Sequence, residues 1–352
     1  SAATGVDRLA PGLALAATVA PSRVRRLAFT RRASRVVGRT DASVVAAARL
    51  LRAAPGVVDA GDAASEPSEP GSAGSPTVAV RARDVRGTAG VSTSDAERAL
   101  GDVLVERGFA VDLEDPDREL RALFAGDVCV LGWLAVAAER GFGERAPTER
   151  PFFQPGSMAP QLARGLVNLA LPGPEALDGA RLLDPMCGTG GVCLEAGLVD
   201  AAPVGLDAQR KMVHGTRRNL RHLLPGDAVA AGPGGAGGGF PDDPPWSVLR
   251  GDAARLPLRD GAVDAVVFDA PYGRQSKVVS RSTERLVGDA LGESRRVVRD
   301  DPPATAGPGR VVVVGDRDWS DAAATAGLSV RETFARPVHR SLTRHVVVCE
   351  TG

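Results

Sequence analysis

The sequence predicts an α/β protein in which an N-terminal α+β region precedes a doubly wound, mostly parallel sheet. From about residue 160 onward, short apolar runs alternate with longer amphipathic stretches, as strands alternate with the helices that connect them. A glycine-rich turn separates the first of these strands from the next helix, and open α/β sheets bind ligands at such turns. Before this pattern, strand-like segments surround a single helix within residues 77–133.

The N-terminal region, residues 1–150, is expected to contain a small sheet covered by at least one helix. Residues 13–20 favour a strand over a secretion signal, because no basic segment precedes them. A helix is predicted over residues 92–108, with Ser94 as its cap and Glu97 three residues later. The strands of this sheet are predicted over residues 77–83, 110–113, 119–124 and 128–133.

The C-terminal region, residues 151–352, has the longer alternation of strands and helices. Residues 263–268 (VDAVVF) are strongly β-branched and predict a buried strand. Further strands are predicted over residues 180–183, 203–206, 309–314 and 345–349, and helices over residues 161–171, 191–197, 210–224 and 282–299. Three stretches rich in Gly, Pro, Ser or Asp are predicted to be loops: residues 59–76, 226–245 and 300–309.

Composition excludes several classes of protein. The chain of 352 residues is 43% hydrophobic and 24% charged, which suits a chain with two packed cores. No apolar run approaches the roughly 20 residues that a membrane helix needs, so no membrane partner is expected. The four cysteines have no paired spacing, which argues against a disulfide framework and a metal site and favours the cytoplasm. Nine Arg against two acids in residues 1–50 provide a local positive charge suited to a nucleic acid, or a solvated basic face.

The glycine-rich turn, within LLDPMCGTGG at residues 182–191, is the first candidate site. An acid at the strand end would repel a pyrophosphate but would hold an ammonium group, such as that of S-adenosylmethionine (SAM). The glycines let a ligand approach the backbone, and the spacing is not the GxGxxG of a dinucleotide site. The other interpretation is a tight turn without a ligand. The cofactor-binding residues predicted here are Asp184, Met186, Gly188, Thr189 and Gly190.

Two more acids follow predicted strands. Asp207 stands 23 residues after Asp184, where an acid can accept hydrogen bonds from both ribose hydroxyls of an adenosyl group. Asp252, followed by Ala253, is placed to accept from the adenine amino group. Each acid could instead cap a helix or a turn. The sequence thus predicts Asp207, Asp252 and Ala253 as further cofactor-binding residues.

The second candidate site is Asp269-Ala270-Pro271-Tyr272, again at the end of a strand. It resembles motif IV of the amino-methyltransferases, which reads Asp/Asn-Pro-Pro followed by an aromatic residue. The carboxylate and the Ala270 carbonyl would accept hydrogen bonds from a base amine, and Tyr272 would stack on the base to orient it. Ala270 departs from the motif, which is expected to soften the loop without removing the carbonyl acceptor, because any residue supplies one. The other interpretation is an ordinary strand-to-loop turn.

Further resemblances narrow the family. Residues 150–164 (RPFFQPGSMAPQLAR) resemble the segment that completes the SAM pocket in tRNA guanine N2-methyltransferases. Residues 77–133 resemble a THUMP domain, an RNA-binding module of tRNA-modifying enzymes, with a domain extent of about 77–135. Residues 27–32 (LAFTRR) resemble the N-terminal region that precedes this domain in the same family. Residues 339–344 (HRSLTR) resemble a C-terminal loop of archaeal and eukaryotic enzymes acting on guanosine 10 of tRNA. Two Arg, a Ser and a Thr near the active edge of the sheet suggest that Arg340 and Arg344 bind phosphate, and the other interpretation is a solvated hairpin.

Taken together, the chain resembles the archaeal tRNA (guanine(10)-N2)-methyltransferase family. The resemblance implies a THUMP-containing half, a Rossmann-like SAM-dependent methyltransferase half, tRNA as partner, and transfer of one or two methyl groups to a guanosine amine. A near alternative is another guanosine in tRNA or ribosomal RNA. Methylation of adenine N6 in DNA uses a similar motif, but the THUMP-like half argues against it. An alternative of a different class is a tRNA-binding protein that has lost turnover.

Overall fold

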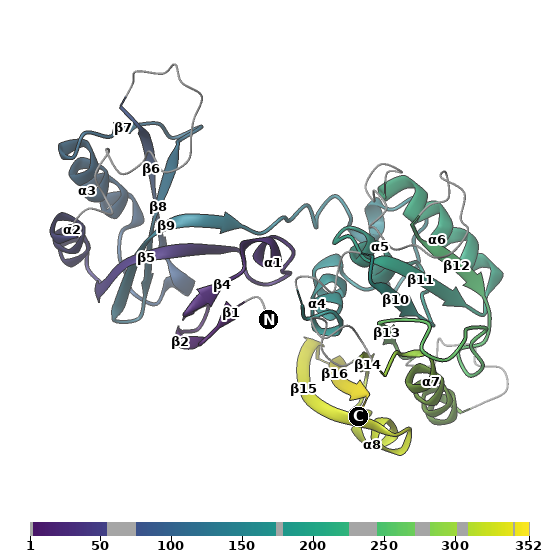
Figure 1. Ribbon diagram of the computed structural model, residues 1–352. Coiled ribbons are helices and arrows are strands. Elements are labelled where there is room, and N and C mark those ends of the chain that lie inside the picture. The colour runs from purple at the N-terminus through teal and green to yellow at the C-terminus, as the bar shows by residue number, and fades with distance from the viewer. Residues whose placement is uncertain are drawn as a thin grey trace. The chain divides into compact units, whose positions relative to one another are not determined.

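Figure 1 shows the computed structural model of the chain, which describes residues 3–54, 75–173, 179–224, 245–271, 282–300, 309–340 and 342–351. The chain forms two compact units. One contains residues 2–25 and 30–138, and the other contains residues 26–29 and 139–352. Within the described residues, no helix is both long enough and apolar enough to span a bilayer.

The N-terminal unit is built on a five-stranded sheet with the order β5-β9-β8-β6-β7. Buried side chains of two helices and of one sheet face, among them Leu51, Leu100 and Phe124, form its main core. A short N-terminal hairpin adds a second, smaller cluster around Leu13. The elements are β1 (Ala3–Thr4), β2 (Asp7–Ala10), β3 (Leu13–Leu15), β4 (Thr18–Val19), α1 (Pro21–Arg25), β5 (Arg32–Asp41), α2 (Val44–Ala53), β6 (Thr77–Asp84), α3 (Thr93–Glu106), β7 (Ala110–Val111), β8 (Arg118–Ala125) and β9 (Val128–Ala137).

The start of α3 differs from the expectation. Ser92, not Ser94, is the N-cap, and its side chain accepts a hydrogen bond from the Asp95 amide. Glu97 does not close a capping box, since its carboxylate accepts from the Ala82 amide of β6 at 2.9 Å. The carboxylate that the sequence pattern predicted for the start of the helix thus accepts a hydrogen bond from a backbone N–H of β6.

The C-terminal unit contains the doubly wound sheet, with the strand order β12-β11-β10-β13-β14-β16-β15. The first five strands in this order are parallel, and β15 and β16 form an antiparallel hairpin at one edge. The predicted fold class is therefore confirmed. The elements are α4 (Pro160–Ala170), β10 (Arg181–Asp184), α5 (Gly191–Gly197), β11 (Ala202–Asp207), α6 (Arg210–Leu223), β12 (Ser247–Arg250), β13 (Ala265–Asp269), α7 (Thr283–Val297), β14 (Arg310–Gly315), α8 (Ser320–Thr325), β15 (Leu328–His339) and β16 (Leu342–Thr351).

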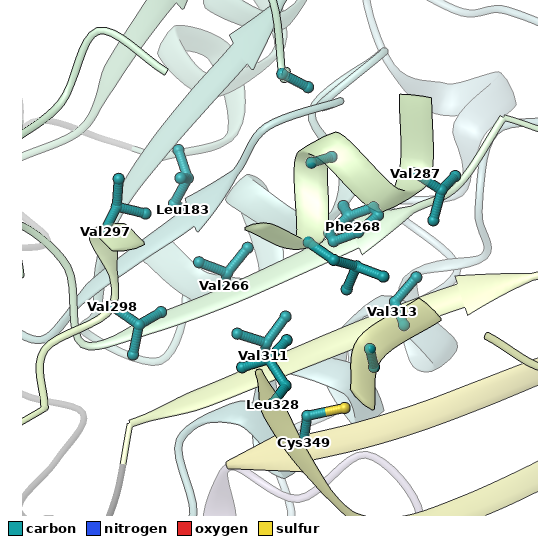
Figure 2. Close-up of a cluster of buried hydrophobic side chains, with 14 of the residues drawn as sticks. Leu183, Val266, Phe268, Val287, Val297, Val298, Val311, Val313, Leu328 and Cys349 are labelled. Atoms are coloured by element: carbon teal, nitrogen blue, oxygen red, sulfur yellow. The ribbon is translucent and has the colours of Figure 1, made fainter. Parts of the chain in front are cut away.

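Both faces of this sheet are buried, which explains its β-branched runs. Figure 2 shows one face, where Val266 and Phe268 of β13 pack beside Val313 of β14 and Val287 of α7. The intervening residues of the same strands, such as Val267, pack on the opposite face against α4 and α5. Because successive strand residues point to opposite faces, a strand buried on both sides has a continuous apolar sequence.

A short N-terminal segment also belongs to the C-terminal unit. The Ala28 amide donates to the Asn168 side chain at 3.0 Å, and its carbonyl accepts from the Gln161 side chain at 3.0 Å. The ring of Phe29 occupies the space beside Gly165, where a Cβ would come within 2.7 Å of it. Residues 26–29 and 139–150, which the sequence placed in the N-terminal region, thus pack with α4 and its neighbours.

A buried ion cluster ties this unit together and provides a stability test. Glu195 of α5 is fully buried and accepts from Arg145 at 2.9 Å and Arg164 at 2.8 Å. Glu195→Ala leaves the buried guanidinium of Arg164 and the partly buried one of Arg145 without their carboxylate, so we expect the free energy of unfolding to fall by about 3–5 kcal/mol. Chemical denaturation measures this loss. Asp289→Ala, which removes an exposed partner of Arg285, is the control and should cost about 0.5 kcal/mol or less.

Candidate active site

Acidic residues end three adjacent parallel strands of the C-terminal sheet. Asp184 is the last residue of β10, Asp207 of β11 and Asp269 of β13. The order β11-β10-β13 makes these strands neighbours, and parallel strands present their carboxyl ends at one edge. The chain proceeds from β10 to β11 on one side and reaches β13 on the other, so a topological switch point lies between β10 and β13. The sequence-predicted acids therefore gather where a doubly wound sheet binds its ligands.

Asp184 is nearly inaccessible, with 3% of its surface exposed. Its Oδ1 accepts a hydrogen bond from the Met186 amide at 3.1 Å. Burial raises the pKa of this carboxyl well above its ordinary value, and the charges of Asp207 and Asp269 raise it further. Close negative charges in a buried site favour a cationic ligand, because a nearby positive charge stabilises the ionised carboxylates.

Asp207 holds the glycine-rich turn in place. Its Oδ2 accepts from the Gly188 amide at 3.0 Å, and its Oδ1 accepts from the Gln209 amide at 2.8 Å. Burial raises the pKa of its carboxyl as well. Asp207 is not the cap of the following helix, because the N-cap of α6 is Gln209, and the ribose-binding role remains a prediction that this position suits.

The glycine-rich turn requires glycine at two positions. Gly188 and Gly190 have φ values of 51° and 79°, in the left-handed region that glycine favours. At Gly190 a Cβ would also come within 2.6 Å of the Thr216 methyl group. Thr216 donates to the Gly188 carbonyl at 2.8 Å, which fixes the turn against α6. The backbone of the turn is therefore tightly packed and held in one conformation.

The segment from residue 150 to 158 is attached to this turn. Asn219 of α6 accepts from the Phe152 amide at 2.8 Å and donates to the Phe152 and Thr189 carbonyls, each at 2.9 Å. The hydroxyls of Ser157 and Thr189 lie 3.1 Å apart. Sequence reasoning missed Asn219 and Thr216, although two polar residues three apart on the apolar side of a predicted helix were a signal. The segment expected to complete a cofactor pocket does contact the predicted cofactor loop.

Asp252 and Ala253 follow β12, whose last residue Arg250 pairs with Asp207. The carboxylate of Asp252 accepts from the Ala254 amide at 2.9 Å and so caps this turn. Ala253 is 7% exposed and packs in the core. This turn therefore lies at the same sheet edge as the three strand-end acids, while its contact with an adenine remains a prediction.

At the second candidate site, Ala270 contributes to the sheet. Asp269 pairs with Val314 of β14, and the Ala270 amide donates to the Val314 carbonyl at 2.7 Å. Here an alanine supplies the N–H that a proline lacks and extends the ladder by one bond, while the expected softening of the loop stays a prediction. Pro271 follows directly. Tyr272, the predicted stacking residue, lies outside the described residues.

The predicted phosphate-binding residues flank the turn between β15 and β16. Gly315, at the carboxyl end of β14, pairs with His345, so this turn lies beyond the same edge as Asp269. Arg340 is exposed there, whereas Arg344 pairs with Arg336 and is 9% exposed. Of the two, Arg340 is the more accessible to a phosphate group that approaches from the solvent. Across the described ranges, no cluster of three or more His, Cys, Asp or Glu side chains could hold a metal ion.

Fold and site together define a Rossmann-like methyltransferase, and comparisons with known proteins give the family. Residues 147–235 match a family described as RMKL-like, methyltransferase domain. The tRNA (guanine(10)-N2)-dimethyltransferase of Methanothermobacter thermautotrophicus is 36% identical over 77% of this chain and 72% of its own length. The enzyme of the same name from Pyrococcus abyssi is 30% identical over 78% of this chain and 74% of its own length. The chain belongs to the tRNA (guanine(10)-N2)-dimethyltransferase family, which confirms the predicted resemblance.

Two further similarities are more distant. The tRNA (guanine(6)-N(2))-methyltransferase THUMP3 of Bos taurus is 29% identical over 50% of this chain and 32% of its own length. The crystal structure of TrmN from Thermus thermophilus is similar over 96% of this chain and 87% of that one, at 22% identity and a TM-score of 0.46.

Proposed function

We propose that this methyltransferase transfers methyl groups from SAM to N2 of guanosine 10 in tRNA. The observation that carries the proposal is the convergence of Asp184, Asp207 and Asp269 at one edge of the sheet, beside the glycine-rich turn. Two relatives named for this reaction, each similar over more than two thirds of its own length, support the choice of substrate.

SAM supplies an electrophilic methyl group on a positively charged sulfur, and the residues present suit such a molecule. Asp184 would hold its ammonium group, and Asp207 would accept hydrogen bonds from its ribose hydroxyls. The raised pKa of Asp184 is evidence for this fit, since a carboxylate that is costly to ionise alone is stabilised by a cation beside it. Gly188, where a Cβ would meet only the Met186 carbonyl oxygen at 4.0 Å, would let the cofactor approach the backbone closely.

Asp269 and Ala270 would bind and orient the guanine amine, which is the nucleophile. The lone pair of a guanine amine is delocalised into the ring, so the nitrogen attacks poorly unless its geometry changes. Hydrogen bonds from its two N–H groups to the Asp269 carboxylate and the Ala270 carbonyl favour a more pyramidal nitrogen aimed at the methyl group. The nitrogen becomes positively charged as it is methylated, and the proton then leaves toward Asp269. We propose that Tyr272 stacks on the extruded base.

The N-terminal unit would bind the tRNA through its shape and phosphates. Its predicted THUMP domain and eight of the nine arginines of residues 1–50 support this role, the ninth, Arg26, belonging to the C-terminal unit. In the C-terminal unit, Arg340 and Arg344 would add phosphate contacts near the reaction edge. Phosphate contacts position an RNA without reading its sequence, so the choice of nucleoside is assigned to the Asp269 corner.

The test is a methyl-transfer reaction with labelled SAM and an unmodified tRNA transcript. We expect label in N2-methylguanosine or N2,N2-dimethylguanosine at position 10, identified after nuclease digestion and mass spectrometry. A transcript with adenosine at position 10 should accept no label. Label at guanosine 6, the position in the name of the bovine relative, would favour that alternative target. Binding of tRNA without any transfer would favour a binding protein that has lost turnover.

A further inference from the structure

We propose that two copies of this chain associate through β15, which pairs in antiparallel orientation with β15 of the second copy about Phe334. The strand forms the edge of the C-terminal sheet opposite to β12 (Figure 1). Its exposed side chains have no part in the proposed reaction, so this inference stands or falls independently of the proposed function.

β15 is a long strand with an open outer edge. It has twelve residues, Leu328–His339, and among the described residues it pairs with β16 alone. Residues 329–338 are exposed, and they include the apolar side chains of Val330, Phe334 and Val338. Backbone N–H and C=O groups along an open edge are a template for pairing with another strand. The edge therefore offers both main-chain groups and apolar side chains to a partner.

The middle of β15 is regular, and its two ends limit where a partner strand can pair. Register shifts relative to β16 lie between Val330 and Glu332 and between Pro337 and His339. Pro337 also has no N–H to donate. Bulges and prolines are features by which natural edge strands prevent pairing. Because they lie at the ends here, they leave residues 332–336 as the segment that a partner strand can meet.

Three side chains of this segment lie on the same face of the sheet. Glu332 and Phe334 stand opposite two valines of β16 that pack in the core against α4, and residues directly opposite in an antiparallel pair share a face. The guanidinium of Arg336 lies 5.6 Å from the centre of the Phe29 ring, and that ring packs beside α4. An acid, an aromatic ring and a base therefore alternate along one face of the edge.

This order of side chains is complementary to itself. When two copies of β15 run antiparallel about Phe334, Glu332 of each copy faces Arg336 of the other, and the two Phe334 rings meet. On the opposite face, Thr333 stands across from Ala335 of the second copy. Opposite charges and aromatic pairs across an antiparallel ladder are both stabilising. Moving the centre by one residue in either direction removes both pairs of opposite charges, so the charges select one register.

Both charged side chains are available for such a partner. Within the described part of the chain, neither Glu332 nor Arg336 forms an ion pair. Arg336 stands opposite Arg344 in the register of β15 with β16, and like charges directly opposite each other destabilise a sheet. By contrast, the neighbouring Arg331 lies 3.5 Å from the Glu350 carboxylate of its own chain. A carboxylate from a second copy would supply the counter-charge that Arg336 needs.

The test measures the mass of the full chain against its concentration by analytical ultracentrifugation. For the wild type we expect a monomer–dimer equilibrium with a Kd of roughly 1–100 μM, as suits a small interface. Glu332→Arg sets positive charges against each other, and Arg336→Glu does the same with negative charges. Each variant alone should associate at least about tenfold more weakly. Arg285→Glu, at an exposed position on α7, is the control and should associate like the wild type.

A mixture of the two variants tests the register itself. One variant is positive at both positions and the other is negative at both, so opposite charges face each other in the mixed dimer. We expect the mixture to form heterodimers with a Kd within about threefold of the wild-type value. This result would also show that both variants are folded.

Three outcomes would overturn the inference. A wild type that stays monomeric up to about 500 μM has no such interface. A dimer that survives in both variants must form at another surface. Variants that are folded by circular dichroism but monomeric both alone and when mixed would show that these charges do not face each other.

Discussion

Asp269→Ala is expected to reduce kcat for methyl transfer by about 10²- to 10³-fold. The substitution removes one of the two acceptors that we assign to the base amine, and a loss confined to the transition state lowers kcat more than it changes binding. Single-turnover transfer of labelled methyl to tRNA measures the effect. The affinity for tRNA, measured separately at one fixed salt concentration, should stay within about threefold of the wild type, because phosphate contacts dominate it.

The matched control is Asp264→Ala at the amino end of the same strand. Asp264 accepts from the Arg181 amide at 2.8 Å and pairs with Arg299 at 3.1 Å, so it has structural partners at the opposite edge of the sheet. This variant should lose some stability but keep its rate per folded molecule. Equal losses of rate in the two variants would mean that Asp269 acts through folding rather than at the reacting amine.

Asp184→Asn is expected to weaken SAM binding strongly and, without SAM, to stabilise the protein. Removing a buried carboxylate that pairs with the cofactor ammonium should cost about 2–5 kcal/mol of binding, or at least about 30-fold in Kd. Isothermal titration with SAM measures this loss directly. Asp264→Asn, at the far edge of the sheet, should bind SAM like the wild type.

The stabilising effect follows from the raised pKa of Asp184. The folded state holds this proton more tightly than the unfolded state, so ionising Asp184 destabilises the fold as the pH rises from its ordinary pKa of 3.8 through the raised value. At neutral pH we expect Asp184→Asn to unfold with a free energy about 0.5–2 kcal/mol higher than the wild type. The difference should vanish below pH 3.8. A variant that is less stable than the wild type at neutral pH would contradict the claim that the buried carboxylate of Asp184 destabilises the folded protein.

The central sheet could be predicted from the sequence because its strands are short, apolar and separated by helices. β13 and β14 are continuous apolar runs, as burial on both faces requires. β5 was not predicted, because register shifts near Ala33 and Val36 interrupt its alternation and no residue along it is fully buried. β12 was not predicted either, because it has only four residues and borders a glycine-rich stretch.

The candidate site was predictable for a related reason. Asp184, Asp207 and Asp269 each end an apolar run, and such acids gather at one edge once the strands are parallel. The residues that support the turn could not be found in this way, since Thr216 and Asn219 lie far along the chain and act through side-chain hydrogen bonds to backbone groups of other segments. The pairing of Glu195 with Arg145 and Arg164 likewise depends on three segments that only the folded chain brings together.

A crystal structure with SAM, or with an unreactive analogue of it, tests the central claim most directly. We predict that its ammonium lies within hydrogen-bond distance of Asp184, its ribose hydroxyls on Asp207, and its methyl-bearing sulfur facing the Asp269 carboxylate. Cofactor bound at another edge of the sheet, or with its sulfur turned away from Asp269, would contradict the account.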